Sequence, residues 1–142
     1  KGEAVVVDFA LSGRYKRGHV PGAWYAVRAR LAKALAAIGP AKPFVFTSED
    51  GILAHLAARD AAALTALPVW VLAGGTAAWT AAGLPMTQGM ENLVDEPDDM
   101  WLRAYDLDTG VEAAMNTYLT WEIDLVHQIE RDGTMRFAQF PA

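Results

Sequence analysis

The sequence predicts an α/β domain with a parallel central sheet flanked by helices, followed by a C-terminal extension with one long helix. Three observations support this prediction. Short, wholly apolar runs end at polar turns, alanine- and leucine-rich segments follow them, and the composition turns acidic after residue 88. Uninterrupted apolar runs are typical of strands covered on both faces, and their alternation with helices favours a parallel sheet.

The expected strands are three runs of apolar residues without an internal charge. Valine, phenylalanine and tryptophan dominate them, and these residues are enriched in strands. The runs are residues 4–7, which end at Asp8, residues 44–46, which follow Pro43, and residues 69–72, which follow Pro68.

The expected helices lie between and after these strands. Residues 27–38 are rich in alanine and leucine with interspersed arginine and lysine, and Gly39-Pro40 ends them. Residues 52–67 follow the second strand, and a short helix over 77–82 follows the third. A turn with two glycines and a proline, residues 18–22, separates the first strand from the first helix.

We place the domain at residues 1–88 and the extension at 89–142. In the extension, apolar residues over 111–131 recur every three or four positions, which predicts one long amphipathic helix. Residues 136–140 could form a last extended segment. The helix is too apolar to stand alone in water, so we expect it to pack on the core, on a neighbouring domain or on a second copy.

Composition excludes several classes of function. The 142 residues suffice for one domain, and 53% of them are hydrophobic, so a sizeable core is possible. The net charge is −5 without a Lys/Arg cluster, which argues against nucleic acid as a partner. No apolar run could span a membrane, and no signal-peptide pattern opens the chain. Because Lys1 stands a few residues before the first strand, without a methionine, we expect a piece of a longer polypeptide.

The absence of cysteine removes disulfides, thiolate metal sites and cysteine nucleophiles from these residues. It fits a cytoplasmic protein. We expect no cofactor and no metal. Attention therefore turns to the loop between the second strand and its helix, where α/β proteins often place reactive groups near a helix N-terminus. The loop residues are Ser48, Glu49, Asp50, Gly51, Ile52 and Leu53.

Two motifs on either side of this loop resemble the signatures of rhodanese-like domains. The first is an aspartate at a strand end followed by Tyr-x-x-Gly-His-Val-Pro-Gly-Ala, over residues 8–23. The second is Val-Leu-Ala-Gly-Gly-Thr-Ala-Ala-Trp over residues 71–79, closed by Gly-Leu-Pro. The resemblance covers residues 1–88. Its signature residues here are Asp8, Gly18, His19, Pro21, Gly22, Gly74, Gly75 and Trp79.

The resemblance implies sulfurtransferase chemistry, in which a loop cysteine takes the outer sulfur of thiosulfate as a persulfide and passes it to an acceptor. The family's loop is Cys-x-x-Gly-x-(Arg, Ser or Thr). Aligned on Gly51, its cysteine position holds Ser48 and its last position holds Leu53. The family often has an arginine two residues after the first-strand aspartate, where this chain has Ala10.

These departures predict a catalytically silent loop. A cysteine thiol has a pKa of about 8.5, which a helix N-terminus lowers further, whereas a serine hydroxyl needs an adjacent base. Glu49 and Asp50 would repel an anionic sulfur donor and instead interact favourably with the helix dipole. We therefore interpret Ser48, Glu49 and Asp50 as an N-capped helix start.

The role expected for such a domain is structural or regulatory. Its partners would be other rhodanese-like domains of the same polypeptide, at least one of them with a cysteine, or further copies in a homo-oligomer. One alternative is an active thiosulfate sulfurtransferase whose cysteine was replaced by Ser48. Another is a binding module whose acidic loop recognises a basic partner or a metal.

Other polar and aromatic residues have structural interpretations. A serine triad of Ser48 with His55 or His19 lacks a nucleophile-elbow motif. Asp8 and His19 are expected to stabilise turns. Gly74-Gly75 lacks the lysine of a phosphate-binding P-loop and predicts a tight strand–helix turn. The tryptophans at 70, 79 and 101 are expected in the core.

Overall fold

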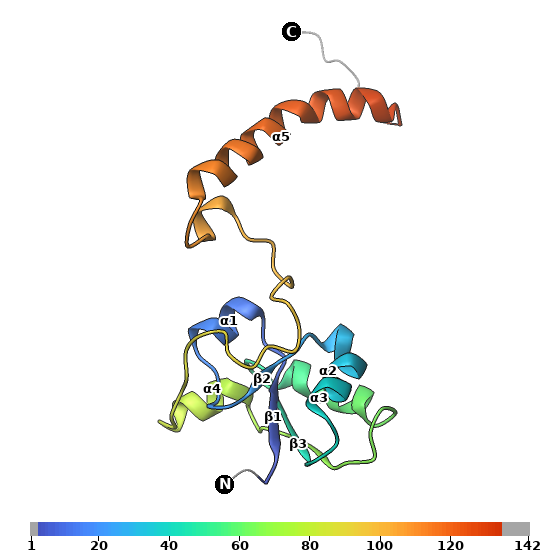
Figure 1. Cartoon of the computed structure of the whole chain (residues 1–142), viewed down its shortest axis with the longest axis vertical. Helices are drawn as coiled ribbons and strands as arrows, with labels where there is room; N and C mark the ends of the chain where they lie inside the picture. Colours follow the sequence, from blue (N-terminus) through green and yellow to red (C-terminus); the bar gives the residue numbers. More distant parts are fainter. Residues whose placement is uncertain (1–2, 135–142) are drawn as a thin grey trace. The chain divides into compact units, whose positions relative to one another are not determined.

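The computed structural model describes residues 3–134, and the chain divides into two compact units, residues 1–100 and 101–142. The first unit holds the sheet and five of the helical segments, and the second holds a short 3₁₀ turn and the long helix (Figure 1). The predicted α/β class, with a parallel sheet and a long C-terminal helix, is confirmed.

The sheet has four parallel strands in the order β2-β1-β3-β4. The register places Asp8, the last residue of β1, opposite both Tyr25 of β2 and Thr47 of β3. The carboxyl ends of three strands therefore meet at one edge. The strands are β1 (Val5–Asp8), β2 (Trp24–Tyr25), β3 (Phe44–Thr47) and β4 (Val69–Val71).

Helices cover both faces of this sheet, as expected for a parallel sheet. Helices α2 and α3 pack on one face, whereas α1 and α4 carry residues of the cluster on the other. The helical segments of the first unit are α1 (Ser12–Arg17), η1 (Arg28–Arg30), α2 (Leu31–Ile38), α3 (Ile52–Ala61) and α4 (Gly75–Ala81).

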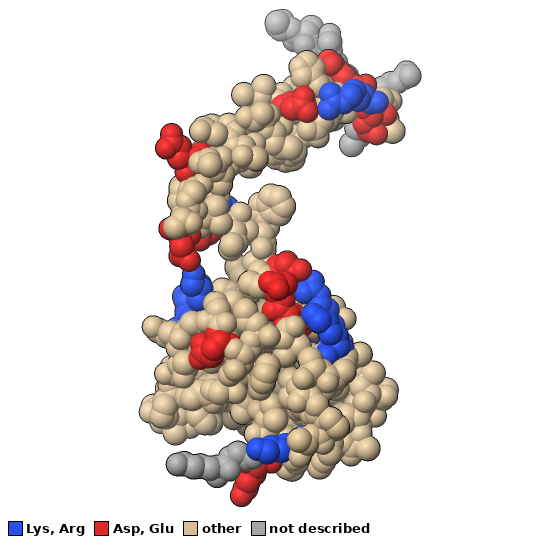
Figure 2. All heavy atoms as spheres, viewed as in Figure 1, with Lys and Arg blue, Asp and Glu red and all other residues tan. Residues whose placement is uncertain are grey.

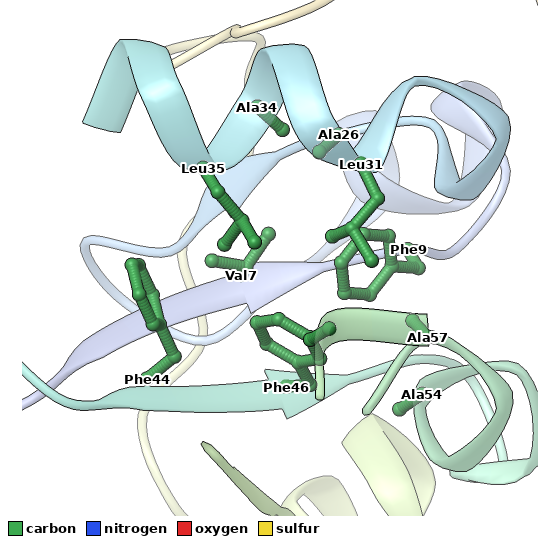
Figure 3. Packing of buried hydrophobic residues seen from close by; sticks show 11 residues of the cluster. Val7, Phe9, Ala26, Leu31, Ala34, Leu35, Phe44, Phe46, Ala54 and Ala57 are labelled. Carbon is green, nitrogen blue, oxygen red and sulfur yellow. The ribbon is translucent and has the colours of Figure 1, made fainter. Parts of the chain in front are cut away.

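The larger core cluster lies between the sheet and the α2–α3 layer (Figure 3). Phe46 is fully buried, and its ring meets the edge of Phe9 with centroids 4.9 Å apart. Leucines of α2 reach down onto Val7 of the sheet, while α3 contributes only alanines at its buried positions. Small side chains let a helix backbone approach the strands closely, which explains the alanine-rich composition of this segment.

A second cluster fills the opposite face and is centred on Tyr15 and Tyr25. Val6 points into it, although its neighbour Val7 belongs to the first cluster. Successive strand side chains point to opposite faces, so β1 contributes to both layers. An all-apolar strand is the sequence pattern that this arrangement requires.

The second unit contains η2 (Ala104–Asp106) and α5 (Val111–Asp132). Gly110 and Gly133, both left-handed, flank α5, and the Gly133 N–H donates to the Ile129 carbonyl. The helix ends within one residue of its predicted range. The extended segment expected at residues 136–140 lies outside the described residues.

The predicted length of α3 is wrong at its C-terminal end. The helix stops at Ala61 instead of near Leu67. The N–H groups of Leu64 and Thr65 both donate to the Ala61 carbonyl, and the Thr65 hydroxyl accepts the Leu67 N–H. This turn reverses the chain so that β4 can lie beside β3. Local helix propensity does not reflect this tertiary requirement, so it could not predict where the helix ends.

The first predicted helix also begins later than expected. Val27 is extended, and its N–H donates to Asp95 Oδ2 at 2.9 Å. A 3₁₀ turn over residues 28–30 then leads into α2. Asp95 is buried and lies 68 residues further along the chain, so the local sequence around Val27 could not predict this contact. The short elements α1 and β2 were not predicted either.

Two of the three tryptophans expected in the core are exposed. Trp70 is 54% exposed on the edge strand β4, and Trp101 is 91% exposed in the second unit. Trp79 is half-buried against the second cluster, and its indole N–H donates to the Pro85 carbonyl at 2.8 Å. An edge strand has one uncovered side, so a large apolar residue in it need not be buried.

Residues 89–99 are tied to the first unit by several hydrogen bonds. The Gly89 N–H donates to the Lys16 carbonyl, the Tyr25 N–H donates to the Asn92 carbonyl, and the Val94 N–H donates to the Tyr25 carbonyl. Asp95 accepts a bond from Lys33 at 2.8 Å. These contacts place residues 89–99 in the first compact unit, which ends at Met100, while the domain boundary at residue 88 stays a prediction. Within residues 3–134, no helix has the length and apolar character needed to cross a bilayer.

Candidate functional site

The loop expected to carry chemistry follows β3 at the edge where the strand ends meet. Thr47 closes β3 beside Asp8, and Ser48 to Gly51 lead directly into α3. Ser48 is buried, with 2% of its surface exposed, whereas the side chains of Glu49 and Asp50 face solvent. The nucleophile position of the loop is therefore inside the fold, below two exposed carboxylates.

The loop's own side chains bond the first N–H groups of α3. The Ala54 N–H donates to Ser48 Oγ at 3.2 Å, and the Ile52 N–H donates to Asp50 Oδ1 at 2.9 Å. Gly51, with φ of +86°, occupies the N-cap position itself. The expected capping is met only in part: Ser48 and Asp50 bond N–H groups of the first turn from positions before the cap residue, whereas Glu49 bonds none of them and no acidic residue stands in the first turn.

Glu49 has a cationic partner outside the loop. Its Oε1 lies 3.1 Å from Nη2 of Arg14 in α1, and both side chains are about half exposed. A pair this exposed holds the two groups together only weakly. Sequence reasoning did not single out Arg14, since a surface arginine in a polar segment carries no signal of its partner. The pair leaves Arg14 oriented toward a carboxylate at the loop, where an anionic substrate would need a free cation.

Helix α4 holds the loop backbone from the other side. The Thr76 N–H donates to the Ser48 carbonyl and the Ala77 N–H donates to the Glu49 carbonyl, each at 2.9 Å. This approach depends on Gly75, which has φ of +63°. A Cβ there would lie 2.2 Å from the Ser48 carbonyl oxygen and 2.5 Å from the Gly51 nitrogen. The predicted strand–helix turn at Gly74-Gly75 therefore also lets the N-terminus of α4 approach and hydrogen-bond the loop backbone.

Asp8 lies buried at the same sheet edge. Its Oδ1 accepts the Ala10 N–H at 2.9 Å, while its Oδ2 has no hydrogen-bond partner among residues 3–134. Burial raises the pKa of Asp8 above its ordinary value, and the Ala10 N–H, the nearby His19 and the Thr76 hydroxyl partly offset this effect. The hydroxyls of Thr47 and Thr76 bond each other beneath the loop at 3.1 Å. Asp8 therefore supports a turn through Oδ1, while its Oδ2 is shielded from solvent and lacks a hydrogen-bond donor among residues 3–134.

His19 is also structural. Its ring is fully buried and stacks on Tyr15 with centroids 3.7 Å apart. Nδ1 lies 2.8 Å from the Tyr15 carbonyl and Nε2 lies 3.0 Å from Glu91 Oε1, so both ring nitrogens are occupied. His55 is an exposed residue of α3. The structure therefore brings no histidine to the hydroxyl of Ser48, whose hydrogen-bond partner is the Ala54 N–H.

The remaining signature residues shape the turns around His19. Gly22 has φ of +75°, which a side chain would disfavour. Gly18 lies close to Met86, and Pro21 follows the buried Val20. These residues position the segment between α1 and β2. They contribute to the fold and leave the chemistry to residues 48–53.

Around Ser48, the described residues form no group of metal ligands, and the cleft nearest in the fold is lined mainly by other segments. Within the described part of the chain, no three histidine or acidic side chains gather as metal ligands would. A cleft of about 490 Å³ opens near the carboxyl ends of β1 and β2. Of the loop, only Leu53 lines it; the other lining residues are Phe9, Ala10, Leu11, Ala26, Val27, Arg28, Ala29, Asp60 and Asp99.

The parallel sheet, the loop after β3 and the glycine-supported α4 define the class of the protein. The sequence pattern of the rhodanese-like domain matches residues 1–82, and the chain belongs to this family. No curated protein matches it.

Solved structures give more specific comparisons. A thiosulfate sulfurtransferase from Pseudomonas aeruginosa is 39% identical with a TM-score of 0.89, and the match covers 99% of this chain. The chain spans only 27% of that protein.

Two further structures match a smaller share of this chain. A protein of unknown function from Rhodopseudomonas palustris, described as a possible tyrosine phosphatase, is 29% identical with a TM-score of 0.54. That match covers 61% of this chain and 72% of the other. A rhodanese-related protein from Thermoplasma volcanium shares the fold at 17% identity and a TM-score of 0.56, with 63% of this chain and 86% of that chain covered.

Proposed function

We propose that this chain is a rhodanese-like domain without sulfur-transfer activity of its own, with a structural or regulatory role in a larger sulfurtransferase. The observation that carries the proposal is Ser48 at the nucleophile position. Its hydroxyl is buried and accepts the Ala54 N–H, and the sequence contains no cysteine. Oxygen forms no stable counterpart of a persulfide, and no base adjoins it to make it a nucleophile.

The electrostatics of the loop support silence independently. A sulfur donor such as thiosulfate is an anion, and it would meet the exposed carboxylates of Glu49 and Asp50. The N–H of Ile52, one donor that could receive an anion, is bonded to Asp50. Arg14, the nearest cation in the described contacts of the loop, is paired with Glu49. In this loop, the groups that could bind an anion are therefore already bonded to the loop's own carboxylates.

The multidomain context rests on the P. aeruginosa thiosulfate sulfurtransferase. Nearly all of this chain, extension included, matches about a quarter of that protein. We propose the same context here, with other rhodanese-like domains of one polypeptide as partners and at least one of them bearing the reactive cysteine. The silent domain would then stabilise the fold of the active domain or control how substrates reach its cysteine.

The test is sulfur transfer from thiosulfate to cyanide, measured on the chain and on Ser48→Cys. We expect no turnover by the chain. We expect little from Ser48→Cys, because both acidic neighbours and Leu53 remain. Turnover by the serine form would refute the proposal. Full activity from the single change would instead favour an enzyme whose cysteine was replaced, and would equally refute it.

The acidic loop is a weaker candidate for a binding site. Glu49 is paired with Arg14 and Asp50 with the Ile52 N–H, so neither carboxylate is held ready for an external cation. No observation favours a metal or a basic partner at this loop over the capping role.

A further inference from the structure

Helix α5 carries a broad apolar surface that its own unit leaves uncovered. None of its residues is buried among the residues that the structure describes. Seven large apolar side chains are at least 39% exposed, including Ile123 at 77% and Val126 at 61%. In Figure 2 the visible face of α5 is mostly tan, and charged groups gather toward its C-terminal end. The seven side chains are Val111, Tyr118, Leu119, Trp121, Ile123, Val126 and Ile129.

Five of these side chains form one stripe along the helix, with Trp121 at its border and Ile123 outside it. Val111, Tyr118, Leu125 and Ile129 follow each other at spacings of seven, seven and four, so they lie along one line. Leu119 and Val126 flank this line one position further on. Threonines and Asp124 occupy the opposite side. An exposed stripe of this size marks an interaction surface rather than a solvated helix.

One charge lies inside the stripe and restricts what can cover it. Glu122 stands four residues after Tyr118, and its Oε1 accepts the tyrosine hydroxyl at 2.5 Å. Covering the stripe would take this carboxylate out of water, where one neutral hydrogen bond does not replace its hydration. A fitting partner therefore presents an apolar surface with an arginine or lysine opposite Glu122.

Two fully overlapping pairings of α5 with a second copy do not meet that requirement. Glu122 lies next to the midpoint of α5, which runs from Val111 to Asp132. Two antiparallel copies with full overlap would bring Glu122 against Glu122 at the two-fold axis. Two parallel copies in register would do the same. Either pairing buries like charges beside each other, which opposes association.

We infer that the apolar stripe of α5 binds a further folded domain of the same polypeptide, and that a cation of that domain pairs with Glu122. The P. aeruginosa relative supports this occupant, because its match includes the region of α5 and most of its chain lies outside the 27% that is covered. The inference uses the multidomain context of the proposed function and is independent of catalytic silence.

Thiol reactivity can test this because the chain has no cysteine of its own. Val126→Cys places a thiol in the stripe. Thr117→Cys places one nine residues away, two and a half turns, on the opposite and exposed face. Maleimide labelling rates are measured by peptide mass spectrometry, once in the 142-residue chain and once in the full-length product of its gene. We expect similar rates for both thiols in the chain, and at least tenfold slower labelling at 126 in the full-length protein.

Charge reversal tests the cation. In the full-length protein, Glu122→Lys should restore labelling at 126 at least fivefold. Asp124→Lys, two residues on and on the opposite face, should leave the protection unchanged, with circular dichroism confirming that both variants keep their helix.

Several outcomes would overturn the inference. Equal labelling in both proteins, or a gene product no longer than these residues, would remove the partner domain. Protection in the 142-residue chain that grows with concentration would show a second copy, and protection at all concentrations would show coverage within the chain. Equal effects of the two charge reversals would remove the pairing with Glu122. Sulfur transfer by the chain would refute catalytic silence and leave this inference standing.

Discussion

The contact between α4 and the loop makes Gly75→Ala the most informative single change. The new Cβ would lie 2.2 Å from the Ser48 carbonyl oxygen, 2.5 Å from the Gly51 nitrogen and 2.8 Å from the Asp50 carbonyl carbon. All three are backbone atoms, so no side chain can rotate away. Helix α4 must move, and the hydrogen bonds from the Thr76 and Ala77 N–H groups are lost or stretched.

The expected loss of stability follows from these terms. Alanine in a left-handed conformation costs about 1–2 kcal/mol, and two hydrogen bonds contribute about 1 kcal/mol each. We therefore expect Gly75→Ala to lower the free energy of unfolding by about 3–4 kcal/mol. Gly83→Ala is the matched control, because Gly83 has φ of +68° and a Cβ added there would meet nothing within 4 Å. Gly83→Ala should lose only the free energy of placing alanine in a left-handed conformation, about 1–2 kcal/mol.

Urea unfolding followed by tryptophan fluorescence and circular dichroism measures both variants. The midpoint should fall much further for Gly75→Ala than for Gly83→Ala, at unchanged slope. Equal losses would mean that the close approach of α4 to the loop does not support the fold, and the argument about Gly75 would be refuted.

Three other changes test the core, the cap and the buried carboxyl. Phe46→Ala should lower the free energy of unfolding by about 3–5 kcal/mol because Phe46 is fully buried, whereas Trp70→Ala, at a side chain 54% exposed, should lose less; urea midpoints decide, and equal losses would contradict the core assignment. Ser48→Ala removes the acceptor of the Ala54 N–H and should cost about 1 kcal/mol, so an unchanged midpoint would contradict the cap. Burial raises the pKa of Asp8 above 3.8, so its contribution to stability is complete below 3.8 and is lost as the pH rises through the raised value. Asp8→Asn should therefore gain stability relative to the parent as the pH rises from 3.8, and urea midpoints at a series of pH values showing the opposite trend would refute this sign.

The sequence alone predicted those features that depend on local pattern. The apolar runs at β1, β3 and β4 identified the strands, since a strand covered on both faces needs apolar residues at successive positions. Gly110 and Gly133 bracket a periodic segment that became α5 almost unchanged. The composition also established that no cysteine stands in the loop, and the signatures indicated the family that the comparison later showed.

Contacts between distant segments were decided only by tertiary structure. The pairing of Glu49 with Arg14, the bond from Val27 to Asp95 and the early end of α3 each depend on how the chain returns to the sheet. Local propensity and periodicity report what a segment favours by itself. They cannot report which backbone group or charge another segment will place beside it. In this domain, such contacts with α1 and α4 hold the loop in place and pair Glu49 with a cation.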